Sequence, residues 1–230
     1  MKYLLVSFLI FVSVLVFSQD NTTDSTNAPS NNNSSSTNTS SNNIYNGWEL
    51  FQEGRYSESI SALQREMQSF PNRINIYVIL GWDYYYLRRY ADMENISQVG
   101  LKIKPNDTRL IRNLAESCFY QGKYQNAIDE FEKYISYNYN QNDPYLPSAY
   151  YYSGICYFNL TSYRKADIAL STANYLQPNN YRIILMLAET KEKLQDLDNA
   201  KKHFEKVLQL KANEIKAIDG LQRINKDNKE

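Results

Sequence analysis

The sequence predicts an all-α protein made of repeated helical hairpins, and three regularities along the chain predict it. Small residues recur with gaps of 34, 34, 39 and 34 residues, a tyrosine or leucine follows each one nine residues later, and prolines close several units. Columns that share one register indicate a repeat protein, in which each hairpin buries its apolar face against the next. The small column is Gly47, Gly81, Ala115, Gly154 and Ala188, and the second column is Tyr56, Tyr90, Tyr124, Tyr163 and Leu197.

Each unit is predicted to be two helices joined by a short turn. Breaks at residues 53–55, 121–123 and 161–162 separate segments with helical apolar spacing. A second small column three residues after the tyrosines is expected where the two antiparallel helices cross. Proline then ends the second helix, because it has no N–H to donate. This second column is Ser59, Ala127, Ala166 and Ala200, with Met93 as the exception, and the prolines are Pro71, Pro105 and Pro178.

The pattern resembles the tetratricopeptide repeat (TPR), a 34-residue helix–turn–helix unit. The best match is the spacing small-x6-Gly-x-Tyr-x2-Ala-x3-Phe, which stands as Ala115, Gly122, Tyr124, Ala127 and Phe131. The resemblance implies a right-handed α-solenoid of about five units over residues 44–214. Residues 215–230 then form a capping helix and tail with one polar outer face.

Several positions depart from the repeat pattern. Glu66 replaces a small residue, Arg88 replaces the turn glycine, and Lys191 stands at a first-helix aromatic position. Ser97 also replaces a large residue of a second helix. Five extra residues separate units three and four, within residues 138–147, and predict a longer loop. That loop is either a contact point or a tolerated insertion.

The N-terminus is predicted to be an export signal. Residues 1–18 contain Lys2, then an apolar run from residue 3 to residue 17, and end in Ser18, after which cleavage is expected. The run is shorter than the roughly 20 residues of a membrane-spanning helix. We therefore expect an exported protein, periplasmic or secreted, with no integral membrane segment after cleavage. Retention of the segment as an anchor is the alternative. Residues 19–43, rich in Asn, Ser and Thr, are predicted to be a disordered linker.

The composition argues against several function classes. Twenty-five basic residues balance 25 acidic ones, whereas nucleic-acid binding needs a basic surplus. His203 is the one histidine, glycine is scarce, and no phosphate-binding loop is present. The sequence thus predicts a protein that is no enzyme and carries no cofactor and no metal. Cys118 and Cys156 fall on adjacent first-helix columns, which leaves both a disulfide and buried free thiols open.

A binding surface is expected on the first helices. In TPR proteins, defined columns of these helices line a concave groove, and here the resemblance places both tryptophans on it. Aromatic side chains with interspersed arginines are typical of binding hot spots. Arg109 and Arg112, one turn apart, are expected to orient the ligand. The predicted partner-binding residues are Trp48, Phe51, Trp82, Tyr85, Tyr86, Arg109, Arg112, Phe119, Tyr120, Tyr151 and Phe158.

These observations favour an exported TPR adaptor that holds a peptide or protein partner in an aromatic groove, in cell-envelope assembly or complex scaffolding. An envelope glycan-binding protein is the alternative, because aromatic faces also stack on sugar rings. A third hypothesis is a scaffold that uses its convex face or the 138–147 loop.

Overall fold

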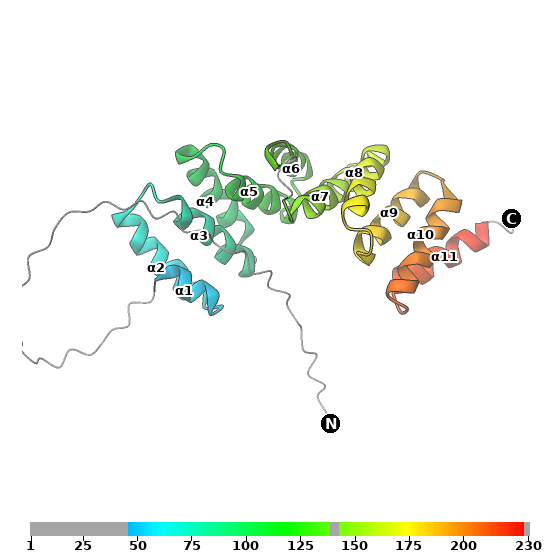
Figure 1. Cartoon of the computed structure of the whole chain (residues 1–230), viewed down its shortest axis with the longest axis horizontal. Helices are drawn as coiled ribbons and strands as arrows, with labels where there is room; N and C mark the ends of the chain where they lie inside the picture. The colour runs from blue at the N-terminus through cyan, green and yellow to red at the C-terminus, as the bar shows by residue number, and fades with distance from the viewer. Residues whose placement is uncertain (1–45, 139–142, 228–230) are drawn as a thin grey trace, which may run out of the picture. The chain divides into compact units, whose positions relative to one another are not determined.

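A computed structural model describes residues 46–138 and 143–227, and within these ranges every regular element is a helix (Figure 1). The predicted export segment and linker, residues 1–43, and the middle of the insertion, residues 139–142, lie outside the described residues. The helices are α1 (Gly47–Gln52), α2 (Tyr56–Ser69), α3 (Ile74–Tyr86), α4 (Tyr90–Ile103), α5 (Thr108–Tyr120), α6 (Tyr124–Asn138), α7 (Leu146–Asn159), α8 (Tyr163–Leu176), α9 (Tyr181–Lys193), α10 (Leu197–Leu210) and α11 (Ile215–Asp227).

Consecutive helices pack as hairpins, which confirms the predicted fold class. Five pairs, from α1/α2 to α9/α10, follow one another, and each second helix also packs on the first helix of the next pair. First helices of neighbouring pairs meet as well: α1 contacts α3, α3 contacts α5, and α7 contacts α9. The last helix, α11, packs on α10 and α9. The described helices thus form the stacked hairpins of an α-solenoid.

The turn inside every hairpin has one residue in the left-handed region. Gly54 and Gly122 have φ of 76° and 72°, and the equivalent positions in the other turns have φ between 56° and 63°. Glycine adopts this conformation without a steric penalty, whereas a side chain with a Cβ pays for it. The turn geometry is therefore set by the repeat and not by the residue that occupies it. The other three residues are Arg88, Thr161 and Gln195.

Small residues let the two helices of a hairpin approach closely. A Cβ added to Gly47 would lie 2.3 Å from Cγ of Leu63, and one added to Gly154 would lie 2.5 Å from Cγ of Leu170. The partner column is fully buried at Ser59 and Ala166. At these crossings the absence of a side chain creates the space that the facing leucine fills.

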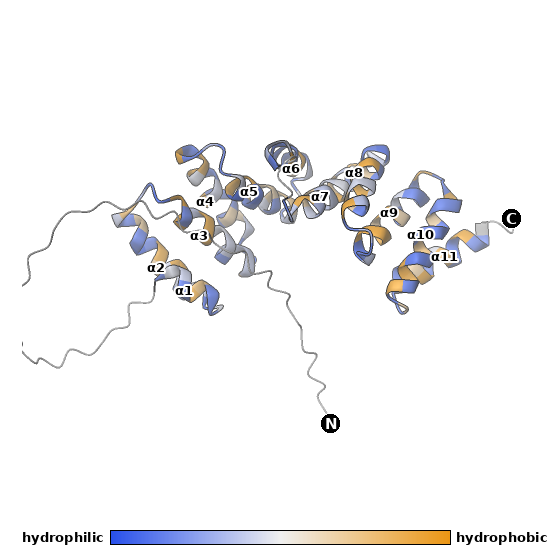
Figure 2. Cartoon of the chain, viewed as in Figure 1, coloured by the Kyte–Doolittle hydropathy of each residue, from blue (hydrophilic) through white to orange (hydrophobic). Residues whose placement is uncertain are grey.

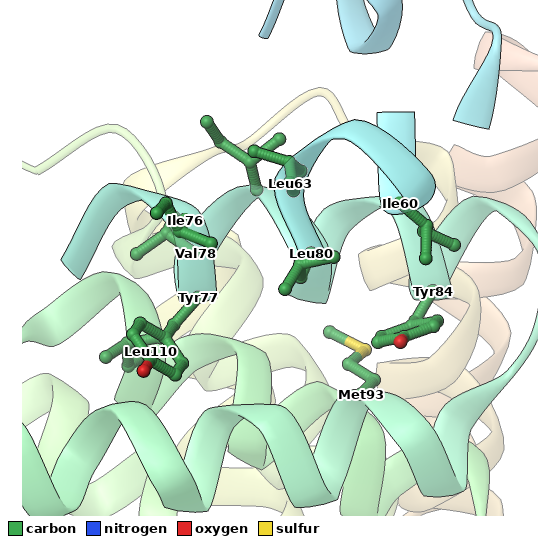
Figure 3. Close-up of a cluster of buried hydrophobic side chains, with 10 residues drawn as sticks. Ile60, Leu63, Ile76, Tyr77, Val78, Leu80, Tyr84, Met93 and Leu110 are labelled. Atoms are coloured by element: carbon green, nitrogen blue, oxygen red, sulfur yellow. The ribbon is translucent and has the colours of Figure 1, made fainter. Parts of the chain in front are cut away.

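Buried apolar side chains of successive helices form clusters between them. The helices carry hydrophobic and hydrophilic residues together (Figure 2). Figure 3 shows one cluster, contributed by α2, α3, α4 and α5, in which Met93 lies next to Tyr84. Met93, the exception in the second small column, is fully buried. The flexible thioether fits a site that other units fill with alanine or serine.

Two departures from the repeat pattern have local partners. The carboxylate of Glu66 accepts a hydrogen bond from the N–H of Gly47 at 3.0 Å and therefore caps the first turn of α1. Nζ of Lys191 lies 3.0 Å from Oδ2 of Asp167 and 3.7 Å from Oδ2 of Asp196. An ion pair thus joins α9 to α8 at a position where the repeat pattern has an aromatic residue.

The described end of the insertion is fixed to α5 and α6. The Tyr134 hydroxyl donates to Oδ2 of Asp143 at 2.6 Å. The backbone N–H of Tyr145 donates to Oδ1 of Asp143 at 2.7 Å. The Tyr145 hydroxyl donates to Glu116, and the guanidinium carbon of Arg112 lies 4.4 Å from the centre of the Tyr145 ring. Residues from 143 onward are therefore anchored before α7 begins.

Candidate functional site: an aromatic row from α1 to α7

Ring contacts run without a break from α1 to α7, and we call this set the aromatic row. Neighbouring centroids lie 4.6–6.4 Å apart, the range in which aromatic pairs attract one another. Phe119 and Tyr152 join α5 to α7 at 4.8 Å, so the row continues across the insertion. Its members are Trp48, Phe51, Tyr56, Trp82, Tyr85, Tyr86, Tyr90, Phe119, Tyr120 and Tyr152.

Two stacked tyrosine pairs repeat within the row. Tyr56 and Tyr86 lie 4.6 Å apart with ring planes 2° from parallel, and Tyr90 and Tyr120 lie 4.7 Å apart at 12°. In each pair the tyrosine after the turn stacks on the last residue of the first helix in the next unit. The pairs are 34 residues apart, so the repeat itself generates the arrangement.

Three phenol hydroxyls of the row lie within hydrogen-bond distance of one another in succession, with Tyr120 in the middle. Oη of Tyr120 lies 3.2 Å from Oη of Tyr85 and 3.4 Å from Oη of Tyr152. Burial raises the pKa of each phenol above its ordinary value, that of Tyr152 to about 12. All three therefore stay protonated at neutral pH and link α3, α5 and α7 through hydrogen bonds.

Most rings of the row are packed by their neighbours, and two of them are exposed to solvent. Trp48 and Tyr86 are 37% and 48% exposed, whereas the remaining rings are half-buried. Rings held by neighbours on several sides lose little conformational freedom when a ligand covers them. The two open rings lie at the α1–α3 end and are each in contact with Phe51.

The two arginines expected to orient a ligand already have partners. Arg109 donates from Nε and Nη2 to the carboxylate of Asp107 at 3.1 and 2.8 Å and from Nη1 to Asn75 at 2.9 Å. Arg112 lies over Tyr145, with Nε 3.6 Å from Oε1 of Glu116. Burial opposes the charge of Arg112, but Glu116 raises its pKa. Both guanidiniums therefore have roles in the packing of α5.

Comparison with known proteins assigns this architecture. A model of the tetratricopeptide repeat matches residues 181–214, which are α9, α10 and the turn after them. The chain has the tetratricopeptide-repeat fold. Mouse and human RNA polymerase II-associated protein 3 are 26% and 27% identical over 126 residues, which is 55% of this chain and 18% of theirs. The chain thus matches less than a fifth of those relatives.

Solved TPR structures agree over most of the chain. MamA from Desulfovibrio magneticus superposes with a TM-score of 0.67 at 20% identity, covering 74% of this chain and 93% of that one. YrrB, described as a TPR protein with an unusual peptide-binding site, gives 0.67 at 12% identity, covering 76% and 88%. At these identities the superpositions show the fold alone. TPR solenoids in general present extended surfaces to protein partners.

The predicted site residues fall into three groups on this TPR scaffold. The rings of Tyr151 and Tyr152 lie 5.6 Å apart, which places Tyr151 at the end of the row, whereas Phe158 contacts Tyr163 instead. Arg109 and Arg112 form the pairs described above. The other predicted residues, which are Trp48, Phe51, Trp82, Tyr85, Tyr86, Phe119 and Tyr120, belong to the row.

Three members of the row were absent from the predicted set. Tyr56 and Tyr90 belong to the column that follows each turn, and Tyr152 lies beside the predicted Tyr151. The repeat could have revealed Tyr56 and Tyr90, because the tyrosine after each of these two turns stacks on the next unit. Tyr152 carries no such signal, because its contacts with Phe119 and Phe131 depend on how the insertion places α7.

The remaining chemistry-bearing residues lie apart from the row. Cys118 and Cys156 are buried free thiols, and burial raises their pKa to about 11 and about 12. Burial lowers the pKa of His203 on α10. Among the described residues, no three His, Cys, Asp or Glu side chains come together as metal ligands. A helix with the length and apolarity needed to cross a membrane is also absent from this part of the chain.

Proposed function

We propose that this chain is an exported TPR adaptor that binds a peptide or protein partner on the aromatic row. The carrying observation is that Trp48 and Tyr86 present open ring surface while Phe51 packs against both of them. Tryptophan and tyrosine held in fixed positions supply large contact area at low entropic cost, which is how binding hot spots act. The adaptor carries out no chemistry and needs no cofactor.

The expected ligand is an extended segment that brings apolar or aromatic side chains. Unit two contributes rings and no charge at its predicted groove positions, and the arginines of unit three are paired with Asp107 and Glu116. Affinity should therefore come chiefly from apolar burial, which contributes about 25 cal/mol per Å². YrrB, a TPR protein described by its peptide-binding site, supports a peptide as the ligand class.

The proposal that the chain is exported to the periplasm or the exterior rests on the charge and apolar pattern of residues 1–18. In that compartment the adaptor would act in envelope assembly or in scaffolding a complex. The sequence motif alone supports this placement. A fusion of residues 1–18 to a reporter that is active only after export tests it, with Lys2→Glu as the impaired variant.

Peptide selection on the full chain tests the binding site. Peptides from a random displayed library would be selected on the wild type, and their affinities measured by calorimetry for two matched double variants. Trp48→Ala with Tyr86→Ala removes the open rings of the row. Ile168→Ala with Tyr175→Ala removes two side chains on α8 that are 70% and 84% exposed and lie outside the row.

We expect selected peptides rich in aromatic and apolar residues, with affinity at least tenfold weaker for the row variant and unchanged for the α8 variant. Equal affinity for all three proteins would contradict the site. The glycan hypothesis makes a different prediction, since soluble envelope glycan would then bind the wild type and lose affinity with the row variant while peptide selection gives no binders.

A further inference from the structure

Asp83 is a buried acid at the junction of the first two TPR units. It lies on α3, is fully buried, and sits between Trp82 and Tyr84 in the sequence. Its Oδ2 lies 2.7 Å from Oγ of Ser59 on α2, and that Oγ lies 2.8 Å from the carbonyl oxygen of Gly47 on α1. One polar chain therefore connects three helices.

The chain of contacts needs two protons. Oxygen atoms at 2.7 and 2.8 Å attract one another only with a hydrogen between them. The Ser59 hydroxyl has one proton, and the carbonyl of Gly47 has none to give. With Asp83 ionised, the one Ser59 proton has two acceptors, Oδ2 of Asp83 and the carbonyl oxygen of Gly47. A protonated Asp83 carboxyl supplies the second proton: it then donates to Ser59 while Ser59 donates to Gly47.

The surroundings of Asp83 favour the same neutral form. Its Oδ1 is buried without a hydrogen-bond partner, which is far more costly for a carboxylate than for a carboxylic acid. Burial raises the pKa of this carboxyl to about 7.

The neighbouring ionisable groups supply no cation. Tyr56 on α2 and Tyr84 on α3 interact electrostatically with Asp83, and burial raises the pKa of both above 10, so both remain neutral. Glu49 on α1 is exposed. Among the charged residues of the other helices packed against α3, Arg65 on α2 and Lys102 on α4 are exposed. The remaining ones lie in ion pairs of their own: Glu58 with Arg55, Glu66 with Arg73, Asp92 with Arg89, Glu94 with Lys123, Asp107 with Arg109 and Glu116 with Arg112.

We propose that Asp83 is a proton-operated clasp: protonated, it holds α1 against α3, and its ionisation loosens α1 and the Trp48 end of the aromatic row. Ionisation leaves the two short oxygen contacts with one proton and places a charge in a site with an unpaired Oδ1. Water then has to reach the carboxylate, and the α1–α3 contact beside it has to open. Trp48 follows Gly47 in the sequence and Trp82 precedes Asp83. The centroids of the two indole rings lie 6.3 Å apart across this contact.

The clasp affects binding only through the function proposed above, but it is testable without a ligand. Trp48 and Trp82 are the two tryptophans of the chain, so intrinsic fluorescence reports on the contact directly. We expect the emission of the full chain to change between pH 5 and 9 with a midpoint near 7. Asp83→Asn, which keeps a donor for Ser59 and cannot ionise, should show no such change. His203→Gln controls for the single histidine and should keep the wild-type transition.

Two results would overturn the clasp: a wild type with no transition in this range, or the same transition in Asp83→Asn. If Asp83→Asn does not fold, NMR of the wild type labelled with 13C at aspartate carboxyls decides. One aspartate carboxyl that titrates above pH 6 supports the clasp, and titration of all of them below pH 5 contradicts it. In a second arm, peptide affinity should fall at least threefold from pH 6 to pH 8 in the wild type alone. Loss of peptide binding at every pH would count against the proposed function and not against the clasp.

Discussion

The indole rings of Trp48 and Trp82 lie 6.3 Å apart at 54° to each other and join α1 to α3. Their environments differ. Trp48 is 37% exposed, whereas Trp82 is half-buried and also packs on Phe51 at 5.6 Å. Both rings pack on Phe51, and Trp48 has the more exposed surface of the two.

This difference predicts unequal costs of truncation. Trp82→Ala should lower the free energy of unfolding by about 2–3 kcal/mol, because the ring leaves a space between α1 and α3. Trp48→Ala should cost about 1 kcal/mol, since much of its surface is already in water. Urea denaturation followed by circular dichroism measures both, and equal losses would contradict this expectation.

The left-handed turn residues predict a stabilising substitution. Thr161 is β-branched and has φ of 57°, a conformation that glycine adopts freely. Thr161→Gly should raise the free energy of unfolding by about 1 kcal/mol. The matched reverse change, Gly122→Ala at φ of 72°, should lower it by about 1 kcal/mol. Thermal unfolding of both variants checks the pair, and a shift of the same sign in both would contradict the turn account.

Asp83 predicts that stability decreases with rising pH. Its pKa is raised from 3.8 to about 7, so the folded state holds the proton over a range in which the unfolded chain releases it. The stabilising contribution is complete below pH 4, decreases between pH 4 and 7 by about 4 kcal/mol at most, and changes no further above pH 7. Asp83→Asn should remove this part of the profile, whereas Asp92→Asn should leave it unchanged. Urea titrations at each pH provide the curve.

The cysteines should be unreactive in the native protein. Both are buried free thiols, and the pKa values of about 11 and 12 leave little thiolate at pH 8. A thiol reagent should modify neither in the native state and both in urea. A native mass two hydrogens lower than that of the reduced chain would instead indicate a disulfide.

The repeat register made the hairpins predictable from sequence. Gly54 and Gly122 marked two of the inner turns, but Arg88 and Gln195 have the same left-handed geometry without a glycine to signal it. Those turns follow from the repeat length and the packing on either side. Tertiary context there overrides the local preference of the residue.

The aromatic row was predictable in part. The repeat pattern predicted Trp48, Trp82 and Phe119, because residues at equivalent positions of successive units face the same way. The contact of Arg112 with the Tyr145 ring was not predictable, since Tyr145 belongs to the insertion and to no column. No column of the repeat marks Asp83, and only the structure reveals its full burial and its contact with Ser59.

Site-specific photocrosslinking tests the central claim most directly. A photoreactive phenylalanine analogue at position 86, in the open part of the row, would be compared with the same analogue at position 175, on α8, in cells that express the full chain. The account predicts that a partner protein is captured from position 86, that capture is lost when Trp48→Ala is added, and that position 175 captures none. Capture from position 175 alone, or from neither position, would contradict binding on the aromatic row.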